Sequence, residues 1–169
     1  LRDHTDRLQV CEMDLSDVDS LQELTTELAG QPIDIFINNA GAAVGYTTDR
    51  DRNVFGALEA EIWVSMFRSN AIGPVLLAQY LYPNLLLGKD KKIIFVTSKP
   101  ASIADNSGGA MYMNRTSRTA LNQAIKSMSI DLKNDGITVA SISPGWVKTA
   151  SGGEGALITA QTSASGMRQ

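Results

Sequence analysis

Four side chains in the middle of the sequence could do chemistry on a bound molecule. Ser98 carries a hydroxyl group, Tyr112 a phenol, Asn114 a carboxamide and Arg118 a guanidinium group. A phenol has an ionisable proton that it can give to a reacting oxygen atom, whereas a carboxamide can only form hydrogen bonds with that atom. The guanidinium group adds positive charge. Together these groups indicate hydrogen bonding and proton transfer at a polar atom of a ligand.

The segment that contains them is predicted to begin as a strand, continue as a loop and end in a helix. Residues 93–96 are an apolar run that stops just before Ser98, as expected for a strand buried on both faces. The Ser-Gly-Gly sequence at 107–109 supplies a polar cap and flexible backbone before the next helical pattern. In open α/β sheets ligands bind where strands end and helices begin, so we expect a site here.

Strand and helix patterns alternate along the whole chain. Apolar runs predict strands at residues 8–13, 33–37, 93–96 and 137–142. Strict alternation of strands and helices implies right-handed crossovers and a parallel sheet with helices on both faces. The predicted fold class is therefore α/β, a doubly wound parallel sheet in a three-layer α/β/α arrangement.

Three helical segments are predicted between these strands. Ser16 can cap the first helix, whose apolar face includes Val18, Leu21, Leu24 and Leu28. Residues 55–87 are mostly helical, with a kink expected at the Gly-Pro pair at 73–74 and a break near Pro83. The third helix covers residues 109–134 and has one apolar stripe, made of Leu121, Ala124, Ile125, Met128 and Leu132.

Composition argues against several classes of function. The net charge of −3 provides no basic face for nucleic acid. The only histidine, His4, has no cysteine or second histidine beside it, so we expect no metal site. The only cysteine, Cys11, cannot form an internal disulfide and fits a reducing compartment, and no apolar run approaches the length of a membrane span. We therefore expect a cytoplasmic protein without nucleic-acid or membrane partners.

Five short motifs, in order, resemble those of the short-chain dehydrogenase/reductase family. They are Asp14 after the first predicted strand, Asn38-Asn39-Ala40-Gly41, Asn70 in a helix, Ser98 at a strand end, and Pro144-Gly145-Trp146-Val147-Lys148-Thr149. Each motif alone is an ordinary turn, cap or strand end, so the resemblance depends on the ordered set, which covers nearly all of the chain. The double glycine before Tyr112 and the residue sequence of the last motif resemble the corresponding segments of the sniffer-like carbonyl reductases.

The resemblance implies a role for each matching residue. Asp14 would contact the adenine of a nicotinamide dinucleotide, and Asn38, Asn39, Ala40 and Gly41 would pass beneath that cofactor. The backbone of Asn70 would anchor a water molecule in a proton relay, and Ser98 would hydrogen-bond the substrate carbonyl. The nicotinamide carboxamide would be held by Pro144, Gly145, Val147 and Thr149.

The resemblance also implies a function for the chain. It predicts one partial Rossmann-like domain over residues 1–169 that uses NADP or NAD, with NADP favoured, to reduce a small carbonyl compound. The helical segments 55–87 and 109–134 correspond to the surface through which many family members form dimers, so a homodimer is expected.

The first departure from the family pattern concerns its Tyr-x-x-x-Lys pair, which falls on Asn114 and Arg118. In the family, the tyrosine gives a proton to the alkoxide that hydride addition leaves, and the lysine four residues later lowers its pKa. Asn114 has no ionisable proton, although Arg118 could still hold ribose hydroxyls. Tyr112 lies two residues upstream, about 200° around a regular helix, so it could substitute only if the first turn is unwound. The alternative function is therefore an inactive relative that binds nucleotide or a protein partner.

The second departure is the absence of the family's first strand and its Gly-rich turn, which cradles the cofactor diphosphate. The chain starts at the family's third strand and stops before its last. The two missing strands belong between the predicted strands 8–13 and 33–37, and backbone pairing cannot span that gap because adjacent strands lie about 4.8 Å apart. We expect a fragment of a longer protein; the alternatives are a rearranged sheet and a sheet completed by another chain.

Overall fold

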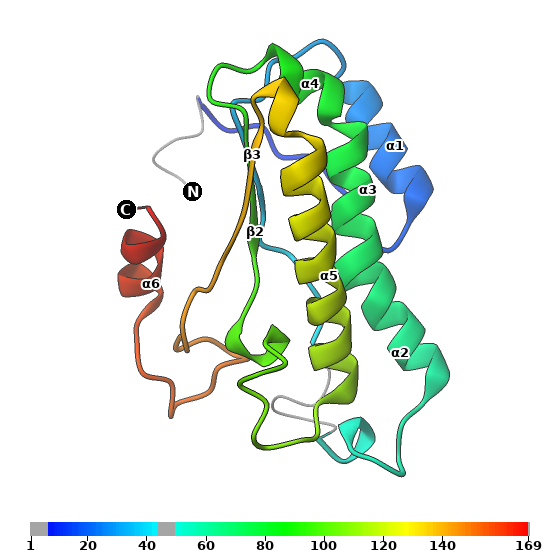
Figure 1. Cartoon of the computed structure of the whole chain (residues 1–169), viewed down its shortest axis with the longest axis vertical. Coiled ribbons are helices and arrows are strands. Elements are labelled where there is room, and N and C mark those ends of the chain that lie inside the picture. The colour runs from blue at the N-terminus through cyan, green and yellow to red at the C-terminus, as the bar shows by residue number, and fades with distance from the viewer. Residues whose placement is uncertain (1–6, 44–49, 169) are drawn as a thin grey trace.

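A parallel three-stranded sheet forms the centre of the structure, a computed structural model that describes residues 7–43 and 50–168 (Figure 1). Its strands are β1 (Ile35–Asn38), β2 (Lys92–Val96) and β3 (Thr138–Ile142), in the order β1-β2-β3. The register aligns Ile37 with Ile94, and Ile94 with Ala140. The runs predicted at 33–37, 93–96 and 137–142 therefore form parallel strands, which confirms the Rossmann-like α/β fold class.

The helices lie mostly on one side of this sheet. They are α1 (Val18–Glu27), α2 (Ala60–Phe67), α3 (Gly73–Tyr80), α4 (Tyr82–Leu87), α5 (Tyr112–Asp131) and α6 (Ala160–Met167). Figure 1 shows α1, α3 and α5 on one side, whereas α6 lies on the other. On that second face Ile35 and Ile37 keep 46% and 59% of their surface exposed. The second helical layer is thus incomplete among the described residues.

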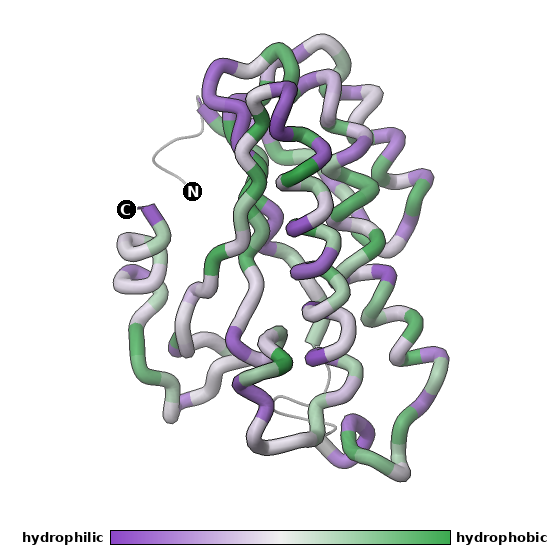
Figure 2. Tube along the Cα trace, in the orientation of Figure 1, coloured by the Kyte–Doolittle hydropathy of each residue, from purple (hydrophilic) through white to green (hydrophobic). Residues whose placement is uncertain are grey.

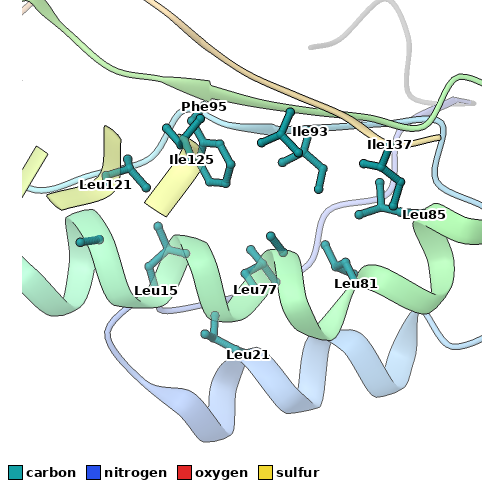
Figure 3. Packing of buried hydrophobic residues seen from close by; sticks show 13 residues of the cluster. Leu15, Leu21, Leu77, Leu81, Leu85, Ile93, Phe95, Leu121, Ile125 and Ile137 are labelled. Atoms are coloured by element: carbon teal, nitrogen blue, oxygen red, sulfur yellow. The ribbon is translucent and has the colours of Figure 1, made fainter. Parts of the chain in front are cut away.

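The hydrophobic core lies between β2 and the helices of the first side. Ile93 and Phe95 of β2 have no exposed surface and face Leu77 of α3 and Leu121 of α5 (Figure 3). Figure 2 shows hydrophobic residues along the central strands. Leu121 and Ile125 of the predicted α5 stripe are buried, and Met128 and Leu132 are half-buried against the same core. The core fixes α5 beside β2, and the end of β2 leads directly into Ser98.

The predicted strand at residues 8–13 is wrong, because this segment forms no strand. A strand needs a neighbour for its backbone N–H and C=O groups. No described strand pairs with the free edge of β1, and 82% of Val10 is exposed. The helix cap predicted at Ser16 is also misplaced: Asp17 caps α1, and its side chain accepts a hydrogen bond from the Asp19 N–H.

The helical segment 55–87 is interrupted where its sequence predicted a kink. One wide π-helical turn, Arg68–Ile72, separates α2 from α3 and ends directly before Gly73. Gly73 lies so close to the loop before α1 that a Cβ atom there would come 1.9 Å from the Leu15 carbonyl oxygen. A second break falls at Leu81, two residues before Pro83. The π turn places Asn70 on the inside of the molecule, where 2% of it is exposed.

Candidate active site

Ser98 stands where β2 has just ended. The Thr97 N–H still donates to the Ile142 carbonyl (2.8 Å), and a short 3-10 turn, Lys99–Ala101, follows Ser98. The hydroxyl of Ser98 does not cap that turn. Its Oγ atom is buried and has no hydrogen-bond partner in the part of the chain that the structure describes. Since buried hydroxyl groups are nearly always paired, the unpaired Oγ is a group with hydrogen-bonding capacity left for a ligand.

The backbone just before α5 has an unusual conformation. Gly109, Ala110 and Met111 all have positive φ angles, of 62°, 48° and 54°. Asn53, which ends the short 3-10 helix Arg50–Asn53, contacts this segment from a distant part of the chain. Its carbonyl accepts from the Met111 N–H (2.8 Å), and its Oδ1 accepts from the Met113 N–H (2.9 Å). Asn53 thus supplies the side-chain cap that Met111 does not, and it fixes where α5 begins.

Asn114 lies in this first turn of α5 and has no exposed surface. Its Oδ1 accepts a hydrogen bond from the Asn53 Nδ2. Its own Nδ2 is buried and has no hydrogen-bond partner among the described residues. The position that the sequence aligns with the family's tyrosine therefore holds a fixed carboxamide with a donor left over and no ionisable group.

Tyr112 is the first residue of α5, and the first turn is not unwound. The Tyr112 carbonyl accepts from the Thr116 hydroxyl (2.6 Å), and its ring lies 6.3 Å from the ring of Phe55. A regular helix turns about 100° per residue, so Tyr112 and Asn114 point in different directions. The condition under which Tyr112 could replace the missing tyrosine is not met in this conformation.

Asn70 joins the loop after β1 to α5. Its Oδ1 accepts from the Ala42 N–H (2.7 Å), and its Nδ2 donates to the Ala42 carbonyl (3.0 Å) and to the Ser117 Oγ (3.1 Å). Asn38 stabilises the same loop by donating to the Ala40 carbonyl (3.3 Å). The sequence pointed to the backbone of Asn70, whereas the structure shows its side chain holding the Asn-Asn-Ala-Gly loop in place.

Arg118 lies against that loop. A Cβ atom at Gly41 would come 3.0 Å from an Arg118 guanidinium nitrogen and 2.9 Å from the Asn70 Oδ1. A side chain at position 41 would therefore displace the Asn70 amide or the Arg118 guanidinium group. Among the described residues Arg118 makes no hydrogen bond or ion pair, so its charge is available beside the loop predicted to pass beneath a cofactor.

Asp14 and the segment 144–149 make contacts of their own, before and after these residues in the sequence. The carboxylate of Asp14 accepts from the N–H and the hydroxyl of Ser16 (both 2.8 Å), and these hydrogen bonds hold the pKa of Asp14 below its usual value. In the other segment, Val147 pairs with Ile158 in a parallel bridge, and the Pro144 carbonyl accepts from the Ser163 hydroxyl of α6 (2.7 Å). The sequence predicted neither this bridge nor α6.

The segment 144–149 is also held by its own turns. Gly145 has a φ of 77°, a conformation that favours glycine. The Trp146 indole donates to the Gly152 carbonyl (2.9 Å), and the Gly152 N–H donates to the Thr149 hydroxyl (3.1 Å). The four residues predicted to hold a carboxamide therefore belong to a folded loop after β3.

Asn53 and Ser117 are the contributors that sequence reasoning missed. Asn53 ends a polar segment that reads as loop, and no periodicity marks it. Ser117 lies on the buried side of α5 and donates to the Met113 carbonyl (2.7 Å) while accepting from Asn70. Only the fold brings these residues to Asn114 and Asn70.

The described residues, 7–43 and 50–168, contain no group of three or more side chains that could hold a metal ion, and His4 lies outside them. No helix in the described part of the chain is long and apolar enough to cross a membrane. A cavity of about 280 Å³ beside α5 is lined by Pro100, Ile103 and Arg115 among others, but by none of the candidate residues above.

Comparison with known proteins decides the family. The family model described as short chain dehydrogenase matches residues 1–155. The chain belongs to the short-chain dehydrogenase/reductase family. The C-signal of Myxococcus xanthus is 33% identical over 147 residues, which cover 87% of this chain and 85% of that protein. An uncharacterised oxidoreductase of Saccharomyces cerevisiae is 32% identical over 151 residues, 86% of this chain and 56% of that protein.

Solved short-chain dehydrogenase/reductase structures place the chain near carbonyl reductases. The carbonyl reductase Sniffer of D. melanogaster has a TM-score of 0.84 at 30% identity, over 96% of this chain and 68% of that one. The NADPH-bound carbonyl reductase from chicken fatty liver has a TM-score of 0.87 at 26% identity, over 99% and 70%. The chain therefore spans about two thirds of these reductases and about half of the yeast relative.

The residues present fit one half of the family's dinucleotide cofactor. At the nicotinamide end, the absence of a side chain at Gly41 leaves space beside the Arg118 guanidinium group. The unpaired Ser98 Oγ and Asn114 Nδ2 can form hydrogen bonds with a ligand. On the diphosphate side, no strand of the sequence is followed by a Gly-rich turn. The fit is therefore limited to the end of the cofactor where reaction takes place.

Proposed function

We propose that this protein is a nicotinamide-dependent oxidoreductase that binds a small carbonyl compound and reduces it slowly. One observation carries the proposal: Asn114, which the resemblance aligns with the family's proton donor, is fully buried and has no ionisable group. Proximity to carbonyl reductases whose structures hold NADPH or NADP supports the cofactor class, with NADP favoured.

The side chains of this site would bind and orient the carbonyl group. Ser98 Oγ and Asn114 Nδ2, both buried and unpaired, would donate hydrogen bonds to its oxygen. The guanidinium of Arg118, beside Gly41, would hold ribose hydroxyls of the cofactor. A bound nicotinamide would supply the hydride for the carbonyl carbon. The resulting alkoxide then needs a proton, and because position 114 has none to give, that proton comes from water.

The first experiment is a fluorescence titration of the purified chain with NADPH and with NADH, followed by turnover assays with cyclohexanone. Binding of NADPH with slow turnover supports the proposal. Binding without any hydride transfer, even at high enzyme concentration, would contradict it. Restoring the family pair with Asn114→Tyr and Arg118→Lys is expected to raise turnover, provided that the larger ring fits the buried position.

A second function is a module that binds nucleotide or a protein partner without turnover. The relative whose length this chain nearly spans is named as a signal rather than as an oxidoreductase, and this favours the second function. Binding of NADPH without any turnover would favour the nucleotide-binding form of this module, and failure to bind either cofactor would favour the protein-binding form.

We also propose that two copies associate through α2 and α5. Val64 and Ile72, each 49% exposed, lie on the α2 side of this surface, where they line a groove with Trp63 and Phe67. Light scattering of the purified chain tests this. A monomer at all concentrations would contradict it.

A further inference from the structure

Asn53 contacts the candidate site from outside every motif of the family. It is 2% exposed and lies 61 positions before Asn114 in the sequence. It bonds to the Met111 and Met113 N–H groups and to the Asn114 side chain. Asn53 therefore has two roles: its Oδ1 caps α5, and its Nδ2 donates to the side chain of Asn114.

These contacts determine which way both carboxamides face. A backbone N–H can only donate, so Asn53 must turn its oxygen toward Met113 and its NH2 group toward Asn114. An NH2 group cannot accept a hydrogen bond, so Asn114 must present its own oxygen to Asn53. The NH2 group of Asn114 is then left as the unpaired end, as observed. The orientation follows from the Met113 N–H and does not depend on how the two ends of a carboxamide are told apart.

We propose that Asn53 is a positioning residue that sets the Asn114 carboxamide with its NH2 group free to donate to a ligand oxygen. The identity of that ligand as a carbonyl compound rests on the proposed function, whereas the orientation does not. A buried NH2 group without an acceptor is unfavourable, so a neutral carbonyl oxygen or an alkoxide is the chemistry that this end would bind. If Asn53 presented an oxygen instead, Asn114 would turn over and offer its own oxygen, which repels such a ligand.

The substitution Asn53→Asp separates the helix-capping role of Asn53 from its contact with Asn114. One carboxylate oxygen can still accept from the Met113 N–H, so the cap of α5 is kept. The other oxygen replaces the NH2 group and faces the Asn114 oxygen. We expect Asn114 to rotate by about 180° around its terminal bond and donate its NH2 group to the new carboxylate. Asn53→Ser is the second variant, because it introduces no buried charge and removes the NH2 group altogether.

The test uses the side-chain NH2 signal of Asn114 in a nitrogen-15 correlation spectrum, assigned by its loss in Asn114→Asp. In Asn53→Asp we expect this signal to shift downfield, because the NH2 group gains an acceptor. In Asn53→Ser we expect it to shift or split. The signal of the unsubstituted protein should move on addition of cyclohexanone, and in Asn53→Asp this response should be lost. A signal unchanged by both substitutions, in variants whose remaining spectrum is native, would overturn the proposal.

The same spectra separate this inference from the proposed function, because orientation is read without turnover. If the signal shifts in Asn53→Asp but never responds to cyclohexanone, the positioning role holds and the carbonyl function is overturned. If it responds to cyclohexanone but is unaffected at position 53, the carbonyl site holds and the positioning role is overturned.

Discussion

Replacing Asn114 with aspartate should return a proton donor to the site with almost no change in shape. The two side chains differ by one group, so the new carboxyl keeps an oxygen where Asn53 Nδ2 donates. Position 114 has no exposed surface, and burial raises the pKa of a carboxyl group, by up to ~3–5 pH units when burial is complete. The hydrogen bond from Asn53 favours the ionised form and opposes part of this rise. We therefore expect a largely protonated acid at about pH 5–6.

The size of the effect follows from general acid catalysis. A positioned acid contributes about 10²–10⁴-fold to such reactions, and a carboxyl that replaces a tyrosine in imperfect geometry should recover the lower part of that range. Turnover of cyclohexanone with NADPH by Asn114→Asp should exceed that of the unsubstituted protein by about 100-fold at about pH 5.5, and the gain should disappear as pH rises and the acid ionises.

Stability should depend on pH in the same variant. In the folded state the carboxyl pKa is raised, so between its unfolded and folded values the folded protein binds more protons and loses stability as pH rises. Each unit by which the folded pKa exceeds the unfolded pKa lowers the free energy of unfolding above the folded pKa by about 1.4 kcal/mol. Activity should therefore be assayed at the acidic end of the range between these two pKa values. Asn134→Asp, at an exposed position of α5's C-terminal extension, is the matched control and should change neither activity nor its pH profile. A folded Asn114→Asp protein without a gain in turnover at low pH would refute the assignment of position 114.

Three further substitutions test the surroundings of the site. Gly41→Ala places a methyl group 2.9 Å from Asn70 Oδ1 and should weaken NADPH binding roughly tenfold (~1.4 kcal/mol) in a fluorescence titration, whereas Gly108→Ala, with open space around it, should not. Asn70→Ala leaves the Ala42 backbone groups and the Ser117 hydroxyl without their partner, and should lower the free energy of unfolding in urea by about 2–3 kcal/mol. An unchanged value would show that the hydrogen bonds of the Asn70 side chain add no stability. Ser16→Ala removes one of two hydrogen bonds to Asp14, so the pKa of Asp14 in an NMR titration should rise but stay below its usual value, because the backbone N–H still donates. Since a lowered carboxyl pKa stabilises the fold above the unfolded pKa and this contribution is lost as pH falls, the variant should also lose less stability on acidification.

Sequence patterns correctly predicted the strands and helices whose apolar residues are buried in the core. Residues 93–96 and the α5 stripe are apolar because they form the core, so their sequence carries the signal. Residues 8–13 have the same appearance but form no strand, because a strand depends on a partner elsewhere in the chain. The sequence analysis placed two missing family strands between segments 8–13 and 33–37 but still predicted a strand at 8–13, and the free edge of β1 has no described neighbour.

The sequence identified most of the candidate site residues but not the hydrogen bonds between them. Ser98, Asn70 and Gly41 were identified by resemblance, and the structure brings Asn70, Gly41 and Arg118 together. The partner of Asn114 could not be identified, because Asn53 is one polar residue among several in a loop. Contacts between residues 61 positions apart depend on the fold alone.

The buried polar groups of the site separate binding from turnover. Asn70 and Asn53 use their side chains to hold the loop after β1 and the start of α5, and two buried atoms, Ser98 Oγ and Asn114 Nδ2, remain without partners. Both can donate to a carbonyl oxygen in the ground state as well as later in the reaction, so their contribution is to affinity. Under the proposed function a proton is needed only as the alkoxide forms, so the lack of an acid at position 114 would lower kcat and leave KM nearly unchanged. A normal KM for the carbonyl compound with a strongly reduced kcat is therefore the kinetic pattern that this arrangement of side chains implies, and a raised KM with an ordinary kcat would contradict it.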